Sequence, residues 1–194
     1  MSTRRARGVS LVELIVFIVI VGVAMAGIFG AFNTMTAASA DPQVRKQVLA
    51  IAESLMEEIQ LMPFTYCDPD DANAATASSE AGCAVASNNE NGATLGPEGG
   101  EDRYGAGTPF DNVSDYHGFA MGPGIKDLTN TTISGLGSYS ASVTVSKVDL
   151  GSGANQITSA SGELLRIAIT VTGPGSHSIT LEGFRSRYAP NTLP

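Results

Sequence analysis

Glu13 is the residue whose position most needs a chemical explanation. It is a carboxylate at the edge of an uninterrupted apolar run over residues 14–32. A carboxylate at the centre of a membrane helix costs roughly 2.5–3.5 kcal/mol to insert, and less near the interface. Glu13 therefore either lies among the headgroups or is kept for a positively charged partner. Cleavage after Gly8 would create an α-amino group on Val9, four residues before Glu13. On a helix this is one turn, so the new ammonium could neutralise Glu13 in its own chain or in a neighbouring copy.

The apolar run 14–32 is nineteen residues long, and about 20 such residues cross the hydrocarbon core of a membrane as a helix. Three arginines precede this run. Positive charge at the start of a membrane helix holds that end in the cytoplasm, so the rest of the chain is expected on the outer side. There are two alternatives to a segment with a paired Glu13. One is a plain membrane anchor, and the other is a signal peptide that is cleaved after Ala40. The run exceeds the usual apolar length of a signal peptide, about 7–15 residues. The positive charges are Arg4, Arg5 and Arg7.

The chain has two cysteines, Cys67 and Cys83. The outward topology brings them into an oxidising compartment, where a disulfide is expected. Such a bridge would restrict the unfolded chain by about 3 kcal/mol in the loop-entropy model. A metal site is the alternative, but two cysteines without nearby histidines offer too few ligands.

An acidic turn directly follows the first cysteine. Asp68, Asp70, Asp71 and Asn73 offer oxygen ligands of the kind that Ca²⁺ uses. The spacing is not that of an EF-hand, because position 72 has no oxygen ligand and no Gly-x5-Glu follows. We expect a solvated acidic turn, with Ca²⁺ as the alternative, and no other cofactor.

His117, between aromatic residues of segment 110–119, is the remaining candidate for chemistry. No serine or cysteine nucleophile accompanies it in a recognisable catalytic motif. We therefore expect a packed or surface histidine, and a protein that is not an enzyme.

A second helical segment, 41–62, follows the apolar run. Pro42 either kinks the helix or begins a new one as its first residue, and Pro63 ends it. Residues 63–137 form a long loop region, because 72–114 is rich in Ala, Ser, Asn and Gly and lacks apolar periodicity. Apolar side chains within the helix recur at steps of three and four, which indicates one buried stripe: Val44, Val48, Ile51, Leu55, Ile59 and Met62.

The C-terminal region, 138–188, is predicted to form an antiparallel sheet. Apolar and polar residues alternate over three stretches, which suits a sheet with one buried face. The helical stripe would cover that face, so the predicted class is α+β. The stretches are 139–148, 165–171 and 176–188, the last with Ile179, Leu181 and Phe184 as predicted core residues.

The segment Gly8-Val9-Ser10-Leu11-Val12-Glu13-Leu14 resembles the class III signal of type IV pilins and pseudopilins. Precursors of that family have a short basic leader ending in Gly and a Glu at the fifth mature position. Glu13 is fifth when Val9 is first. The family usually has Phe at the first mature position, where this chain has Val. The predicted order of helix, loop and sheet is also that of the type IV pilin fold.

The resemblance implies a cleaved leader 1–8, a transmembrane and filament-core helix 9–40, and an exported head 41–194. Prepilin peptidase would cut between Gly8 and Val9 and N-methylate Val9, and Glu13 would pair with the Val9 amine of a neighbouring subunit. The implied partners are other pilin subunits, contacted through the N-terminal helix, the peptidase and the inner-membrane assembly platform. The subunit would cross the inner membrane once, with its head in the periplasm, and then enter the extracellular pilus.

Three features resemble minor pilins of the mannose-sensitive haemagglutinin (MSHA) type, and PilV-like minor pilins are similar. They are the cysteine pair soon after the helix, the acidic segment 67–73 and segment 110–119. This implies a role in pilus biogenesis or adhesion. A type II secretion pseudopilin and a membrane-anchored binding domain that does not polymerise are the alternatives.

The charge balance argues against a nucleic-acid partner. The chain has 11 Lys and Arg against 19 Asp and Glu, a formal net charge of −8, whereas phosphate binding requires a basic surface. Loss of residues 1–8 would remove three arginines and change the side-chain charge to −11.

Overall fold

The computed structural model describes residues 9–92 and 95–188. The chain divides into two compact units, residues 1–43 and 44–194. Helix α1, Leu11–Leu61, contributes to both units, and Pro42 lies inside it. Within the first unit, residues 11–35 are long and apolar enough to cross a membrane, and none of the most apolar window is buried in the structure.

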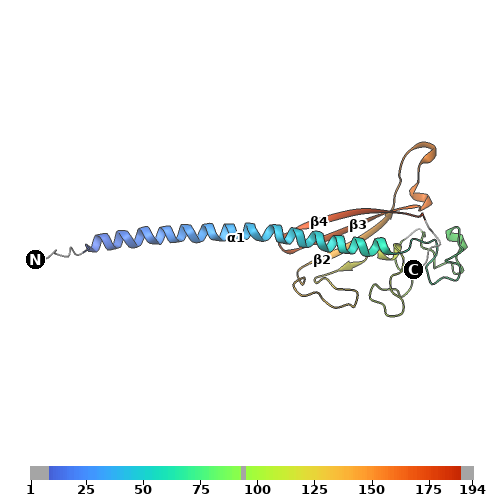
Figure 1. Ribbon diagram of the computed structural model, residues 1–194, viewed down its shortest axis with the longest axis horizontal. Helices are drawn as coiled ribbons and strands as arrows, with labels where there is room; N and C mark the ends of the chain where they lie inside the picture. The colour runs from blue at the N-terminus through green and yellow to red at the C-terminus, as the bar shows by residue number, and fades with distance from the viewer. Residues whose placement is uncertain (1–8, 93–94, 189–194) are drawn as a thin grey trace, which may run out of the picture. The chain divides into compact units, whose positions relative to one another are not determined.

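The second unit contains a four-stranded antiparallel sheet with the order β1-β2-β3-β4. The last turns of α1 lie along its strands (Figure 1). The α+β prediction is therefore confirmed. The strands are β1 (Ala120–Met121), β2 (Ser140–Lys147), β3 (Leu164–Thr172) and β4 (Ser178–Ser186).

The core of the second unit lies between the helical stripe and one face of the sheet. Val48, Ile51, Leu55 and Ile59 are buried, and Val44 and Met62 pack against them as partly buried residues. Each of the six predicted stripe positions therefore contacts the core. The sheet contributes Val143, Val145, Ile167, Ile169 and Val171, which alternate with more exposed residues along β2 and β3.

The prediction of Phe184 as a core residue was wrong. Ile179 and Leu181 pack against the core, whereas Phe184 is 58% exposed. Successive side chains of a strand point to opposite faces, so the odd-numbered residues of β4 face the helix and Phe184 faces outward. Gly183 occupies the inward position, and a Cβ there would lie 2.7 Å from the Met56 sulfur. The helix therefore passes too close to the sheet for a large residue.

Candidate functional site

The N-terminus of α1 is closed by a reciprocal pair of hydrogen bonds. The Ser10 amide donates to Oε2 of Glu13 at 3.1 Å, and the Val12 amide donates to Oγ of Ser10 at 3.3 Å. This is a capping box, which satisfies amides that have no partner within the helix. The helix dipole also favours a negative charge at this end. The Ser-x-x-Glu spacing before the apolar run was a sequence signal for this cap, and our sequence interpretation missed it.

The proposed cleavage point lies at the border of the described part of the chain. Gly8 and the three leader arginines are outside the described residues, whereas Val9 is described and 75% exposed. Val9 precedes the first helical turn, and Glu13 lies within that turn. A cut after Gly8 would therefore leave a new ammonium next to the capped end of the helix.

Cys67 and Cys83 form a disulfide, with the sulfur atoms 2.07 Å and the Cα atoms 5.5 Å apart. Cys67 is fully buried and Cys83 is half-buried. The bridge closes the loop that carries the acidic turn.

Asp71 and Asn73 hold the two ends of this disulfide loop together. Oδ1 of Asp71 accepts hydrogen bonds from the amides of Ala84 and Asn73, at 2.9 and 2.8 Å, and Oδ2 accepts one from the Val85 amide at 3.0 Å. These bonds, that from Ala84 foremost, lower the pKa of Asp71. The side-chain amide of Asn73 donates to the Gly82 carbonyl at 2.8 Å.

Asp68 and Asp70 belong to a different arrangement. Their carboxylates lie with that of Asp111 in one group, in which one oxygen of each residue is within 4.8 Å of the others. The structure thus separates the four residues that the sequence suggested as calcium ligands into two pairs. Asp111 comes from a distant loop segment, so the spacing around residue 68 could not reveal it.

His117 has a structural contact. Its Nδ1 accepts a hydrogen bond from the Val145 amide at 3.3 Å, and the residue is exposed. This bond ties the end of the short helix η2, Ser114–Tyr116, to strand β2.

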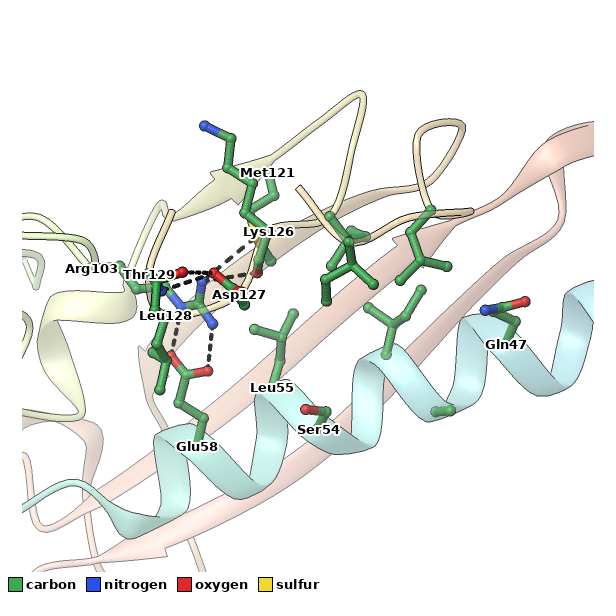
Figure 2. A pocket seen from close by; sticks show the side chains of 15 residues that line it. Gln47, Ser54, Leu55, Glu58, Arg103, Met121, Lys126, Asp127, Leu128 and Thr129 are labelled. Atoms are coloured by element: carbon green, nitrogen blue, oxygen red, sulfur yellow. Dashed lines mark hydrogen bonds and ion pairs between the residues drawn. The ribbon is translucent and has the colours of Figure 1, made fainter. Parts of the chain in front are cut away.

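A groove of about 530 Å³ separates α1 from the loop that follows β1 (Figure 2). One of its ends is closed by a bidentate ion pair, in which Nε and Nη2 of Arg103 each lie 2.6 Å from an oxygen of Glu58. The Tyr116 hydroxyl donates to the same carboxylate at 2.8 Å. Burial and then the negative charge of Glu58 raise the Tyr116 pKa above its usual value. The ion pair joins residues 45 positions apart, a separation at which sequence patterns carry no signal.

Comparison with known proteins gave one match. Residues 3–29 match the family model described as the prokaryotic N-terminal methylation motif. The matched segment includes the basic residues, Gly8, Val9, Glu13 and most of the apolar run. No curated protein and no solved structure matches the chain.

Proposed function

Since the N-terminal methylation motif indicates a type IV pilin-like or pseudopilin protein, we propose that this chain is a minor pilin, a structural subunit of a type IV pilus. Prepilin peptidase removes residues 1–8 and methylates Val9. Residues 9–40 anchor the subunit in the inner membrane and later enter the filament core, and residues 41–194 form the exported head. The position of Glu13 relative to the cleavage point, inside the matched motif, carries this proposal.

The apolar helix supports assembly because its described large side chains are mostly exposed. Large apolar side chains along residues 11–35 are exposed, so they require either lipid or other helices. A Cβ on Gly22, Gly27 or Gly30 would meet nothing within 4 Å. The chain itself therefore does not require glycine there, whereas close packing of neighbouring helices uses small residues.

Glu13 supports the same function through its charge. A carboxylate in lipid is costly unless it is paired. The capping box supplies hydrogen bonds from within the chain but no positive charge. The methylated ammonium of a neighbouring Val9 would supply that charge and make docking of a new subunit favourable.

The MSHA-type assignment rests on the loop region. The disulfide that follows α1, the acidic turn beside it and the packed segment 110–119 are the features that resemble those minor pilins. A type II secretion pseudopilin would share the processing and the helix, so filament content is the observation that separates the two.

Variants of Glu13 test the proposal in a strain that makes the pilus. Glu13→Ala removes both the cap and the charge, whereas Glu13→Gln keeps a hydrogen-bond acceptor at the cap and removes only the charge. We expect both variants at wild-type levels in the membrane fraction. In sheared filaments we expect a decrease of about tenfold or more, because about 1.4 kcal/mol of lost pairing corresponds to tenfold.

Quantification of both fractions distinguishes the outcomes. Wild-type chain in the membrane but absent from sheared filaments would contradict the pilin role and leave a pseudopilin or an anchored binding domain. Normal incorporation of Glu13→Ala would rule out the pairing role of Glu13. A decrease for Glu13→Ala alone would assign the effect to the cap and not to the charge.

A further inference from the structure

Seven carboxylates gather in the loop region of the head, outside the proposed assembly segment. They form three overlapping groups, and in each group one oxygen per residue lies within 4.8 Å of the others. The first and second groups share Asp68, and the first and third share Glu98. We call the set the carboxylate cluster: Asp68, Asp70, Glu90, Glu98, Glu101, Asp111 and Asp115.

Backbone pairing brings the first members of the cluster together. The Asp68 amide donates to the Asn88 carbonyl at 2.9 Å, and the Glu90 amide donates to the Tyr66 carbonyl at 3.0 Å. These two bonds form an antiparallel bridge centred on Cys67. Asp68 and Glu90 are thus diagonal neighbours across this bridge, and a carboxylate oxygen of one lies within 4.8 Å of a carboxylate oxygen of the other.

Asp115 comes from a second loop segment, residues 111–115. Its Oδ2 accepts hydrogen bonds from the amides of Asp111 and Asn112, at 2.9 and 2.7 Å. The segment is tied to the end of α1, because the Val113 amide donates to the Pro63 carbonyl at 3.1 Å. These contacts fix the position of Asp115 and leave its Oδ1 without a hydrogen-bond partner among the described residues.

Two members are buried with unsatisfied oxygens. Asp115 is 0% exposed and Glu90 is 2% exposed. Oε2 of Glu90 accepts a hydrogen bond from the Ser114 hydroxyl, but no described residue donates to its Oε1. Oε2 of Glu98 and Oδ1 of Asp111 also lack donors in the described chain. A buried carboxylate without compensation is strongly unfavourable, so these oxygens require a proton or a cation.

The pKa values of the cluster also indicate that its carboxylates require a proton or a cation. Burial, followed by the charge of neighbouring carboxylates, raises the pKa of Glu90 to about 11 and that of Glu101 to about 9. Burial also raises the pKa of Asp111 and of Asp115 to about 7. A bound cation would reverse these shifts by favouring the charged forms.

We propose that the carboxylate cluster is a binding site for Ca²⁺ that clamps three loop segments of the head together. The donors are all carboxylate oxygens, which hard divalent cations prefer, whereas zinc sites use His and Cys. Ca²⁺ takes 6–8 oxygens in flexible geometry, while Mg²⁺ requires a near-ideal octahedron. Three overlapping and irregular groups of carboxylates therefore suit Ca²⁺ better.

This site differs from the acidic turn that the sequence suggested. Asp68 and Asp70 belong to it, but Asp71 and Asn73 instead hold the disulfide loop. The clamp would join residues 66–70, 95–101 and 111–115 to Glu90, and these described segments have few strands or helices to fix them. Extracellular modules bind Ca²⁺ with dissociation constants of about 0.1–1 mM, which is the range we expect for an exported head.

Calorimetry on the full chain tests the proposal directly. The chain is purified in detergent, stripped with EDTA and titrated with CaCl₂ and, separately, with MgCl₂. We expect saturable Ca²⁺ binding, weaker Mg²⁺ binding and a higher unfolding temperature in Ca²⁺ than in EDTA.

Three variants and a control locate the ion. Glu90→Gln and Asp115→Asn are isosteric, and we expect each to weaken Ca²⁺ binding about tenfold or more. Each amide resembles the protonated carboxyl that the raised pKa favours in the absence of the ion, so in EDTA these variants should be at least as stable as the wild type. Asp70→Asn, at an exposed position, should weaken binding without affecting folding. Glu182→Gln removes a carboxylate on the outer face of β4 and should bind Ca²⁺ like the wild type.

The results that would overturn the proposal are equally specific. A wild-type chain whose heat signal and unfolding temperature do not respond to Ca²⁺ would show that protons alone neutralise the cluster. Wild-type affinity in Glu90→Gln, Asp115→Asn and Asp70→Asn would place the ion elsewhere. An equal loss in Glu182→Gln would indicate general attraction to an acidic protein.

Discussion

Glu58 and Arg103 show how a single ion pair fixes the loop region to the helix. The guanidinium is bidentate on the carboxylate, and the side chains are only 5% and 14% exposed for Arg103 and Glu58. Tyr116 adds a third contact. Among the described residues, Glu13 at the other end of the same helix is bonded at the helix cap. Two carboxylates on one helix are therefore suited to different tasks, internal anchoring and contact with another chain.

Substitution of Glu58 by Gln should destabilise the head strongly. It would leave the buried Arg103 charge without a counter-charge, which typically costs about 3–5 kcal/mol. Unfolding of the full chain in detergent can be followed by tyrosine fluorescence, because the chain has five tyrosines and no tryptophan. Glu57→Gln, on the exposed side of the same helical turn, is the matched control and should change stability by at most about 0.5 kcal/mol. Equal stability of the two variants would contradict this role of the ion pair.

At this scale the sequence predicted some residues well and others not at all. Glu13 stood out because a charge beside an apolar run is conspicuous, and the two cysteines had only each other as partners. The carboxylate cluster was not predictable, because Glu90 and Asp115 lie 22 and 47 residues after Asp68. Each looks like an ordinary solvated acid until backbone bridges bring it beside the others.

The helix and strands match the periodicity of apolar residues in the sequence wherever one face of the element is buried. The stripe on α1 was predictable because helical burial recurs every three to four residues. The sheet was predictable because burial alternates along β2 and β3. Strand β1 has only two residues, too few to show alternation. Phe184 was misassigned because hydrophobicity was given more weight than the alternation set by Ile179 and Leu181.

The register of β4 leads to a pair of opposite expectations. Phe184→Ala removes a large apolar side chain from the outer face and should cost at most about 0.5 kcal/mol. Gly183→Val adds only a small side chain, but it faces Met56 on the helix, and overpacking typically costs about 1–3 kcal/mol. Unfolding midpoints of the two variants check this order. A greater loss for Phe184→Ala would mean that the strand is shifted by one residue.

At the scale of the whole molecule, the acidic charge is unevenly distributed. The formal net charge is −8, and the carboxylate cluster concentrates seven of the acids in one part of the head. This concentration opposes folding when the acids are ionised and unpaired. The stability of the head should therefore depend on pH.

Stability in EDTA should fall as the pH rises. The pKa values of Asp111 and Asp115 are raised by burial from 3.8 to about 7. The folded state therefore holds more protons than the unfolded state between about pH 4 and 7. The resulting stability is present below the unfolded pKa and is lost as the pH passes through the folded one. Unfolding midpoints measured from about pH 5 to 8 should decrease, and less steeply in Asp115→Asn. A rise over this interval would contradict the assignment.

The proposed assembly role also belongs to the whole molecule, because it involves two parts of the chain that need different surroundings. The apolar residues 11–35 have exposed side chains suited to lipid or a filament core, while residues 44–92 and 95–188 enclose their own core. A processed N-terminus is what would convert a membrane anchor into a filament subunit. The start of the mature chain is therefore the property on which the proposed function depends.

The most direct test is the mass of the N-terminal peptide of the chain isolated from cells. We predict a peptide that begins at Val9 and is heavier by one methylene group, as N-methylation requires. A peptide that retains Met1 and the residues up to Gly8 would identify an unprocessed anchor. One that begins at Asp41 would identify a secreted protein, and either result would contradict the account.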